Sequence, residues 1–352
     1  MKKAIKTLFS RVIEQKTALI ETEQRLDIEE NTPEKSKRNF FFIHIPKTAG
    51  TSFRKSLEDQ YTVIADYGSE SGETAIEIKE HAYISHNPYL LKSILSNTNF
   101  DWLCGHVTLQ KYIDIVPVTN TVAFVREPLT QFISHYNHFV HKHGFKGDIM
   151  TFLSTNKGAI NCQHRYLDFL PLGLIGCVGL TEKYDESLLL INDHSGSILQ
   201  SKSENINHVK ALEKDTLDES IKQLILEKNY LDIKLYEEAT FIFQQRFRLF
   251  NAKVPWVFGY ANITINKALY GCAYFAKSLE AVVLSIHKNG EEINQIKAQG
   301  FYSRHCKTNF PRERYIGFHY PLSKTVNSDD VFDVYVKDTG QKINYQGLRI
   351  ND

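Results

Sequence analysis

One lysine and three hydroxyl side chains fall within the short segment Pro46-Lys47-Thr48-Ala49-Gly50-Thr51-Ser52. The apolar run before it, residues 40–45, indicates a buried strand, and a helical pattern follows it. A strand–loop–helix unit directs backbone N–H groups and the positive end of a helix dipole at one point, which suits a phosphate or sulfate group. The simpler interpretation is a turn that carries a solvated lysine.

The segment differs from the loop that binds nucleoside triphosphates with magnesium. That loop has the form GxxxxGK[ST], whereas here Lys47 precedes Gly50 and the loop is shorter. The spacing therefore favours a 5′-phosphate that carries one further group over a triphosphate.

A second junction between a strand and a helix carries a guanidinium group. Residues 121–125 indicate a buried parallel strand that ends at Arg126, and Ser134 lies about two turns into the helical pattern that follows. Ligands of open α/β sheets bind beyond the carboxyl ends of the strands, so Arg126 stands where a ligand docks. A guanidinium suits a phosphate and repels a metal ion. The alternative is a structural ion pair with a neighbouring carboxylate.

Together these motifs resemble those of sulfotransferases that use 3′-phosphoadenosine 5′-phosphosulfate (PAPS), in particular carbohydrate sulfotransferases such as the heparan sulfate 2-O- and 6-O-enzymes. The first segment is similar to their 5′-phosphosulfate loop, and Arg126 with Ser134 is similar to their 3′-phosphate motif. The resemblance extends over residues 39–250. It implies PAPS as co-substrate, no metal, and a donor site made of Lys47, Thr48, Ala49, Gly50, Thr51, Ser52, Arg126 and Ser134.

The reaction implied by this resemblance needs a fixed cation and a base. Negative charge grows on the leaving phosphate during sulfuryl transfer, and Lys47 is the candidate to stabilise it. The acceptor hydroxyl must lose a proton to a group that is neutral near pH 7, which favours histidine. His106 follows the short apolar run 102–105, and members of the family resembled carry a catalytic histidine in a similar Gly-His-Val context. The catalytic residues predicted are thus Lys47 and His106.

The histidines also allow three interpretations other than His106 as the catalytic base. His106 could be a packed residue that bonds a backbone carbonyl, and His44 is the second candidate for the base, although its alternation with apolar neighbours favours a core position. The cluster of histidines in residues 135–143 could suggest a metal site, but no cysteine or carboxylate stands beside it at zinc-ligand spacing, which favours a solvated or acceptor-facing helix. Arg165 and Lys183 are candidates to meet an anionic acceptor, or ordinary surface charges.

Composition limits the other partners. The chain has 352 residues with 42 Lys and Arg against 41 Asp and Glu, so no global basic field indicates nucleic acid. Its five cysteines have no CxxC spacing, which argues against a disulfide framework and favours a reducing compartment, so we expect cytoplasmic localisation. No segment reaches the roughly 18 consecutive apolar residues that a transmembrane helix requires.

The order of patterns predicts three regions. Residues 1–38 indicate an amphipathic helix and linker, which we expect to pack on the body or on a second copy of the chain as a homo-oligomer; loose contact with a membrane surface is the alternative. Residues 39–254 predict an α/β catalytic domain, a P-loop-like parallel sheet flanked by helices. Residues 255–352 predict a small all-β, sandwich-like accessory domain, with Asn289-Gly290 as a type I′ hairpin turn.

The strands of the α/β region are expected at 40–45, 101–104, 121–125 and 176–180, and its helices at 128–143, 182–193, 206–228 and 232–250. The prediction for function is a sulfotransferase that acts on a hydroxyl of a glycan, polysaccharide or glycolipid. A kinase-like nucleoside-triphosphate enzyme and a non-catalytic nucleotide- or glycan-binding module are the alternatives, and a protein tyrosine is an alternative acceptor.

Overall fold

The computed structural model describes residues 39–201, 211–264, 267–305, 307–323 and 326–350. The helix predicted within residues 1–38 lies outside these ranges. Within them, no helix has both the length and the apolar composition to cross a membrane.

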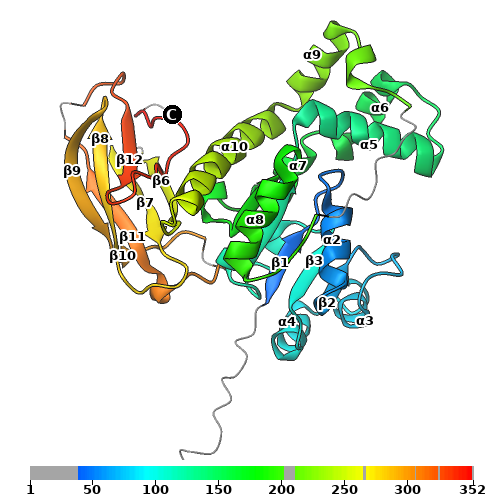
Figure 1. Cartoon of the computed structure of the whole chain (residues 1–352), viewed down its shortest axis with the longest axis horizontal. Helices are drawn as coiled ribbons and strands as arrows, with labels where there is room; N and C mark the ends of the chain where they lie inside the picture. Colours follow the sequence, from blue (N-terminus) through cyan, green and yellow to red (C-terminus); the bar gives the residue numbers. More distant parts are fainter. Residues whose placement is uncertain (1–38, 202–210, 265–266, 306, 324–325, 351–352) are drawn as a thin grey trace, which may run out of the picture. The chain divides into compact units, whose positions relative to one another are not determined.

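The α/β region is built on a five-stranded parallel sheet in the order β2-β3-β1-β4-β5 (Figure 1). This confirms the predicted fold class and four predicted strands, with an additional strand, β2, at one edge. β2 is short, and three of its four residues are half-buried, as is typical of a strand at the edge of a sheet. The strands are β1 (Phe40–Ile43), β2 (Val63–Asp66), β3 (Trp102–Gly105), β4 (Thr121–Val125) and β5 (Cys177–Leu180).

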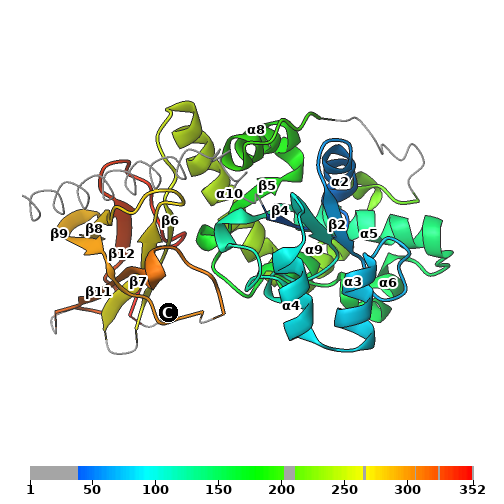
Figure 2. The same cartoon turned by 90° about the horizontal axis from the view of Figure 1, so that it is seen from below.

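Helices cover both faces of this sheet, with α2 and α8 on one side and α4 on the other (Figure 2). Phe53 and Leu57 of α2 and Leu91 and Leu95 of α4 are buried in the same hydrophobic cluster as the strands. The described helices are α2 (Gly50–Glu58), α3 (Ile76–Ile78), α4 (Pro88–Asn97), α5 (Pro128–His143), α6 (Ile149–Thr155), α7 (Cys162–Leu167), α8 (Tyr184–Ser195), α9 (Glu219–Lys228) and α10 (Tyr230–Asn251).

The bounds of α5 follow from its sequence. Pro128 occupies the first turn, where its missing N–H is no loss, and the carboxylate of Glu127 accepts hydrogen bonds from the first backbone N–H groups. The helix ends at Gly144, whose φ of 65° is the left-handed conformation that glycine adopts without strain. Arg126 is therefore held directly before a well-defined helix start.

Antiparallel sheets follow the α/β region, as predicted. One has the order β10-β11-β7-β6 and the other β12-β8-β9, and the buried side chains between them form a separate hydrophobic cluster. The turn between β8 and β9 confirms the predicted type I′ hairpin, because Asn289 and Gly290 both have positive φ. The strands are β6 (Phe258–Ile263), β7 (Ala268–Tyr274), β8 (Val282–Lys288), β9 (Glu291–Ala298), β10 (Gly300–Phe301), β11 (Tyr315–Pro321) and β12 (Phe332–Val336).

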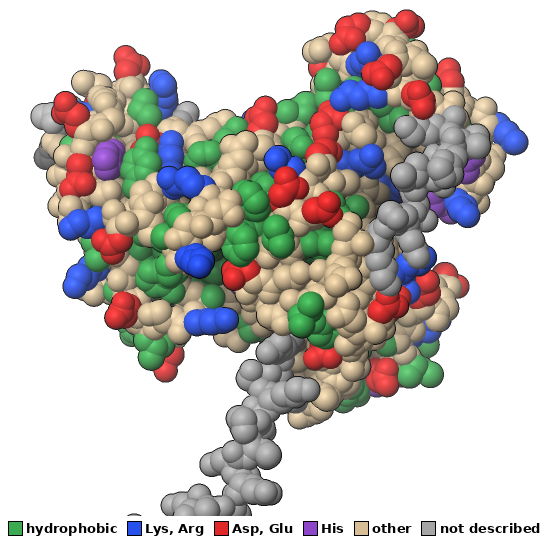
Figure 3. Space-filling model, in the orientation of Figure 1, with side chains coloured by type: hydrophobic (Ala, Val, Ile, Leu, Met, Phe, Trp, Pro, Cys, Tyr) green, Lys and Arg blue, Asp and Glu red, His purple; other side chains and the backbone are tan. Residues whose placement is uncertain are grey.

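Basic and acidic side chains are interspersed on the face of the molecule in Figure 3. This agrees with the near-neutral composition of the chain. An anionic ligand must therefore be recognised by a local arrangement of charges rather than by the field of this whole face.

Candidate functional site

The candidate residues follow three adjacent strands of the parallel sheet. Lys47 lies in the loop after β1, His106 follows β3, and Arg126 follows β4. β1 pairs with β3 on one side and with β4 on the other, so these three carboxyl ends lie side by side. The strand order also reverses at β1, which makes this the edge where ligands bind in open α/β sheets. The structure thus brings the predicted lysine, arginine and histidine to one edge.

The loop between β1 and α2 is shaped by its backbone. Lys47 and Ala49 have φ values of 68° and 65°, in the left-handed region that non-glycine residues rarely adopt. The carbonyl of Ile45 accepts from the Thr48 hydroxyl at 3.0 Å, and that of Pro46 accepts from the Gln131 amide at 2.9 Å. These contacts hold the loop in a conformation that costs energy by itself.

The carbonyl of Lys47 is also engaged, because it accepts from the guanidinium of Arg126 at 3.2 Å. In a trans peptide the N–H points away from the carbonyl, and the described chain has no cis peptide. The N–H groups of Lys47 and Thr48 therefore point away from the side chains that bind the loop carbonyls. Such consecutive N–H groups form a concave surface that suits an anion.

Helix α2 continues this arrangement. Its N-cap, Ala49, has no side chain that could satisfy the first N–H groups, and the first turn holds no acidic residue. Thr51 is exposed beside it, whereas the hydroxyl of Thr48 is buried and donates within the loop. Of the predicted hydroxyls, that of Thr48 therefore closes the loop, and Thr51 and Ser52 lie on the first turn of the helix.

Two cations share this site. Burial lowers the pKa of Lys47, and the charge of Arg126 lowers it further. Burial likewise lowers the pKa of Arg126. Two partly desolvated cations close together are unfavourable unless an anion lies between them, so their arrangement fits a phosphate-bearing ligand.

The carboxylates nearest to Arg126 are used elsewhere. Glu127 caps α5 and pairs with Lys214 at 3.0 Å. Glu182 accepts from the backbone N–H of Glu127 and from the hydroxyl of Tyr236. Within the described ranges, Arg126 forms no ion pair, so the predicted alternative of a structural ion pair does not account for it.

A buried amide holds Arg126 in place. Gln163 accepts from the backbone N–H of Arg126 at 2.7 Å and donates to its carbonyl at 2.8 Å. Asp232 of α10 in turn accepts from the backbone N–H groups of Gln163 and His164, at the start of α7. Gln163 and Asp232 lie within the range of the family resemblance, but no spacing rule in the sequence indicates that Gln163 contacts Arg126.

Ser134 lies on α5, two turns after Arg126, and is half-buried. Its hydroxyl forms no hydrogen bond to another described residue. Gln131, one turn earlier, ties the same helix to the loop carbonyl of Pro46. The placement of Ser134 on a helix fixed to the loop is compatible with its predicted role, which stays a prediction.

His106 is oriented by the backbone of a neighbouring strand. Its Nδ1 lies 2.5 Å from the carbonyl oxygen of His44, and since a carbonyl only accepts, Nδ1 carries the proton. In the neutral ring Nε2 is then the unprotonated nitrogen. Burial lowers the pKa of His106, while the bond to the carbonyl opposes that effect. The ring is therefore neutral near pH 7, as a base must be.

A pocket of about 480 Å³ opens beside His106. His135 lines it, and burial together with nearby cationic groups lowers the pKa of His135 to about 4. Phe139 and Tyr166 supply aromatic walls, and Arg165, which donates to the carbonyl of Gly158, lies at the same pocket. Sequence reasoning did not single out His135 from its cluster, because helical spacing alone does not tell which face meets a pocket.

Other predicted candidates lie apart from this pocket or lack the geometry for another use. Lys183 pairs with Glu186 at 3.6 Å and does not line the pocket. Over the described ranges, no group of three or more His, Cys, Asp or Glu side chains is arranged to hold a metal ion. The four described cysteines are free and buried.

Comparison with known proteins bears on this arrangement. Residues 34–174 match the model of a family described as the sulfotransferase family. The chain matches no curated protein and no solved structure. The matched range includes the loop with Lys47, the end of β3 with His106 and the end of β4 with Arg126. Residues 34–174 are therefore similar to enzymes of the sulfotransferase family, a similarity that implies PAPS as the sulfuryl donor.

Proposed function

We propose that this enzyme transfers the sulfuryl group of PAPS to a hydroxyl of a carbohydrate, in a glycan, polysaccharide or glycolipid. One observation carries the proposal: the loop after β1, Arg126 after β4 and His106 after β3 converge at one edge of the sheet beside a pocket. An anion site, a neutral base and room for an acceptor are the three parts that sulfuryl transfer requires.

Two regions of this edge would hold the donor. The N–H groups at the loop and the start of α2, with Lys47, Thr51 and Ser52, suit the 5′-phosphosulfate. Arg126 and Ser134 suit the 3′-phosphate, and the planar fork of the guanidinium favours bidentate binding of phosphate oxygens. Bound PAPS supplies an activated sulfuryl group whose departure leaves negative charge on a phosphate oxygen. Lys47 would stabilise that charge.

His106 would take the proton of the acceptor. Its Nδ1–H is held by the carbonyl of His44, which leaves Nε2 as the acceptor of a proton. Because burial lowers the pKa of His106, the ring is neutral before the reaction, with Nε2 free to accept a proton. The backbone carbonyl stabilises the ring when it becomes charged.

The pocket favours a sugar as acceptor. Its aromatic side chains Phe139 and Tyr166 offer apolar faces for a sugar ring, and Arg165, His135 and Asn156 offer polar groups for hydroxyls or an acidic substituent. Asn156, Gly158 and Ala159, which precede α7, also line this pocket.

Calorimetry tests the donor part of this proposal. The expected result is metal-independent binding of adenosine 3′,5′-bisphosphate, weakened at least tenfold in Arg126→Ala, with no comparable binding of ATP and magnesium. Preference for ATP and magnesium would favour a kinase-like enzyme instead.

An acceptor screen with radiolabelled PAPS tests the chemistry. We expect label transfer to at least one class of glycan and loss of transfer in His106→Ala. Label transfer to peptide tyrosine alone would overturn the carbohydrate assignment, and donor binding without transfer to any acceptor would favour a non-catalytic module.

A further inference from the structure

A second histidine, His44, lies at the end of β1, directly before the loop. Only 6% of its surface is exposed, and its ring lies 4.3 Å from that of His106, measured between centroids. Sequence alternation favoured a core position for this residue, and its burial agrees. Its polar contacts, however, give the ring a defined orientation that packing alone does not require.

One edge of the ring faces the start of α2. A Cβ atom at position 50 would overlap Cδ2 and Nε2 of His44, so this edge lies directly against the backbone of Gly50. Gly50 is the first residue of α2 and follows the left-handed Ala49. The absence of a side chain at position 50 thus lets Nε2 of His44 reach the anion-binding end of the helix.

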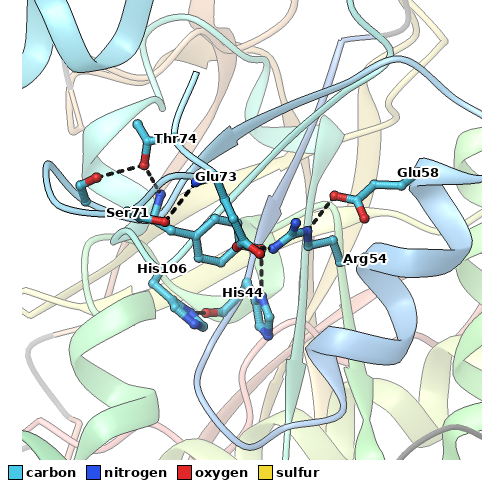
Figure 4. A network of polar contacts seen from close by, with 9 residues as sticks. His44, Arg54, Glu58, Ser71, Glu73, Thr74 and His106 are labelled. Atoms are coloured by element: carbon cyan, nitrogen blue, oxygen red, sulfur yellow. Dashed lines mark hydrogen bonds and ion pairs between the residues drawn. The ribbon is translucent and has the colours of Figure 1, made fainter. Parts of the chain in front are cut away.

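The opposite edge of the ring is fixed by a network of polar contacts (Figure 4). Nδ1 of His44 lies 2.8 Å from the hydroxyl of Tyr67, and the guanidinium of Arg54 lies over the ring of the same tyrosine. Burial raises the pKa of Tyr67, so its hydroxyl keeps its proton and can donate it to Nδ1 of His44. Nδ1 is therefore the unprotonated nitrogen, and Nε2 carries the hydrogen.

Arg54 is itself held firmly in this network. It forms ion pairs of 2.6 Å with both Glu58 and Glu73, and its guanidinium lies 4.7 Å from the centre of the Tyr67 ring. Burial and the neighbouring cations Arg54 and Lys47 lower the pKa of His44, which keeps the ring neutral. The network therefore presents a fixed, neutral N–H donor.

We propose that His44 binds the donor through its Nε2–H, which donates to the 5′-phosphate group at the start of α2. This inference rests on the proposed function, and it adds a side-chain donor that the loop motif does not assign. The same residue orients His106 through its backbone carbonyl, so His44 joins the donor site to the base. The ring's position at Gly50 favours the 5′-phosphate over the 3′-phosphate, which Arg126 would hold.

The test compares two ligands by calorimetry: adenosine 3′,5′-bisphosphate and adenosine 3′-monophosphate. The ratio of their dissociation constants isolates the contacts made to the 5′-phosphate. In His44→Phe, which fills the same space and retains the backbone carbonyl, we expect the ratio to fall by about tenfold, as for loss of one hydrogen bond to a charged group. His44→Gln, whose amide can replace Nε2–H, should keep most of the ratio.

Two further variants separate binding from folding. Tyr67→Phe keeps His44 but removes the hydroxyl that fixes its tautomer, so a smaller fall of the ratio is expected. His194→Phe is the matched control: His194 of α8 is also a largely buried histidine, bonded to the carbonyl of Thr119 in the turn before β4. Its loss should lower the melting temperature and leave the ratio unchanged.

The outcomes distinguish this inference from the proposed function. An unchanged ratio in His44→Phe, with the wild type binding the bisphosphate, would overturn the role of His44 alone. Equal weakening of both ligands in His44→Phe would do the same, because it indicates a general structural effect. Failure of the wild type to bind either ligand would instead overturn the proposed function.

Discussion

The Nδ1 atom of His106 lies 2.5 Å from the backbone oxygen of His44, and this contact joins the ends of two paired strands. The carbonyl fixes which nitrogen of His106 carries the proton and therefore which nitrogen is free to accept one. The same contact had a simpler interpretation, a packed histidine that satisfies a carbonyl. The pocket beside His106 favours the role of a base, which stays a prediction.

Replacement of His106 by Asn should impair the chemical step and spare donor binding. Asn removes the proton-accepting nitrogen, so we expect kcat to fall by about 10²–10⁴-fold, the range for loss of general base catalysis. Steady-state kinetics with saturating donor measures this. The affinity for adenosine 3′,5′-bisphosphate, by calorimetry, should remain within about threefold of the wild type. A comparable loss of affinity would contradict the assignment of His106 as a base.

Both limbs of the pH profile of kcat/KM should lie below the ordinary pKa values of the groups responsible, His106 and Lys47. His106 must be neutral, and burial lowers its pKa below 6.5, so activity falls only as the pH drops below that value. Lys47 must be charged, and its pKa is lowered from 10.5, so activity falls as the pH rises through a value below 10.5. Initial rates between pH 5 and pH 10 test this. An acidic limb above pH 6.5 would contradict it.

Gln163→Leu should weaken donor binding indirectly, through the position of Arg126. The substitution leaves the backbone N–H and carbonyl of Arg126 without their buried partners, which costs about 1–3 kcal/mol for each unsatisfied group. Denaturant unfolding should show the loss of stability, and calorimetry a weaker affinity for adenosine 3′,5′-bisphosphate. Gln223→Leu, an exposed glutamine of α9, is the control and should change neither. Unchanged affinity in Gln163→Leu would show that Arg126 does not need this support.

Gly50→Ala should disturb the site where Gly72→Ala does not. A Cβ at position 50 would overlap the ring of His44, whereas a Cβ at position 72 meets nothing within 4 Å. Displacement of the His44 ring would also break its hydrogen bond to the hydroxyl of Tyr67. We expect loss of stability of about 1–3 kcal/mol for the overpacked position, together with weaker donor binding, from thermal unfolding and calorimetry. Equal behaviour of the two variants would show that the loop yields at Gly50.

Glu238→Gln should stabilise the protein at alkaline pH. Burial raises the pKa of Glu238 from 4.5 to about 7, so its charged form is disfavoured in the folded state. The contribution of this group to stability therefore declines as the pH rises from about 4.5 to about 7, and the amide removes that decline. Melting temperatures of both proteins at pH 5 and pH 8 test this, with a gain expected at pH 8 only. Glu237→Gln, at an exposed neighbouring position, is the control.

Much of the site was predictable because its signals are local. The loop 46–52, the strand that ends at Arg126 and the short strand before His106 each depend on a few consecutive residues, and all lie where the patterns place them. The strand β2 (Val63–Asp66) was missed, because its apolar run is only three residues long and so short a run does not by itself indicate a strand. Tyr67, which follows β2, was missed with it.

The strand–loop–helix units and the kinds of chemical group at their junctions follow from local sequence, because hydrophobic periodicity and turn residues act over short distances. The position of β1 between β3 and β4, which brings Lys47, His106 and Arg126 together, is apparent only in the folded chain. The same holds for the contact of Gln163 with Arg126 and for the contacts of Tyr67 and Gly50 with His44. Strand order and side-chain contacts between distant segments depend on packing of the whole sheet, which no local pattern encodes.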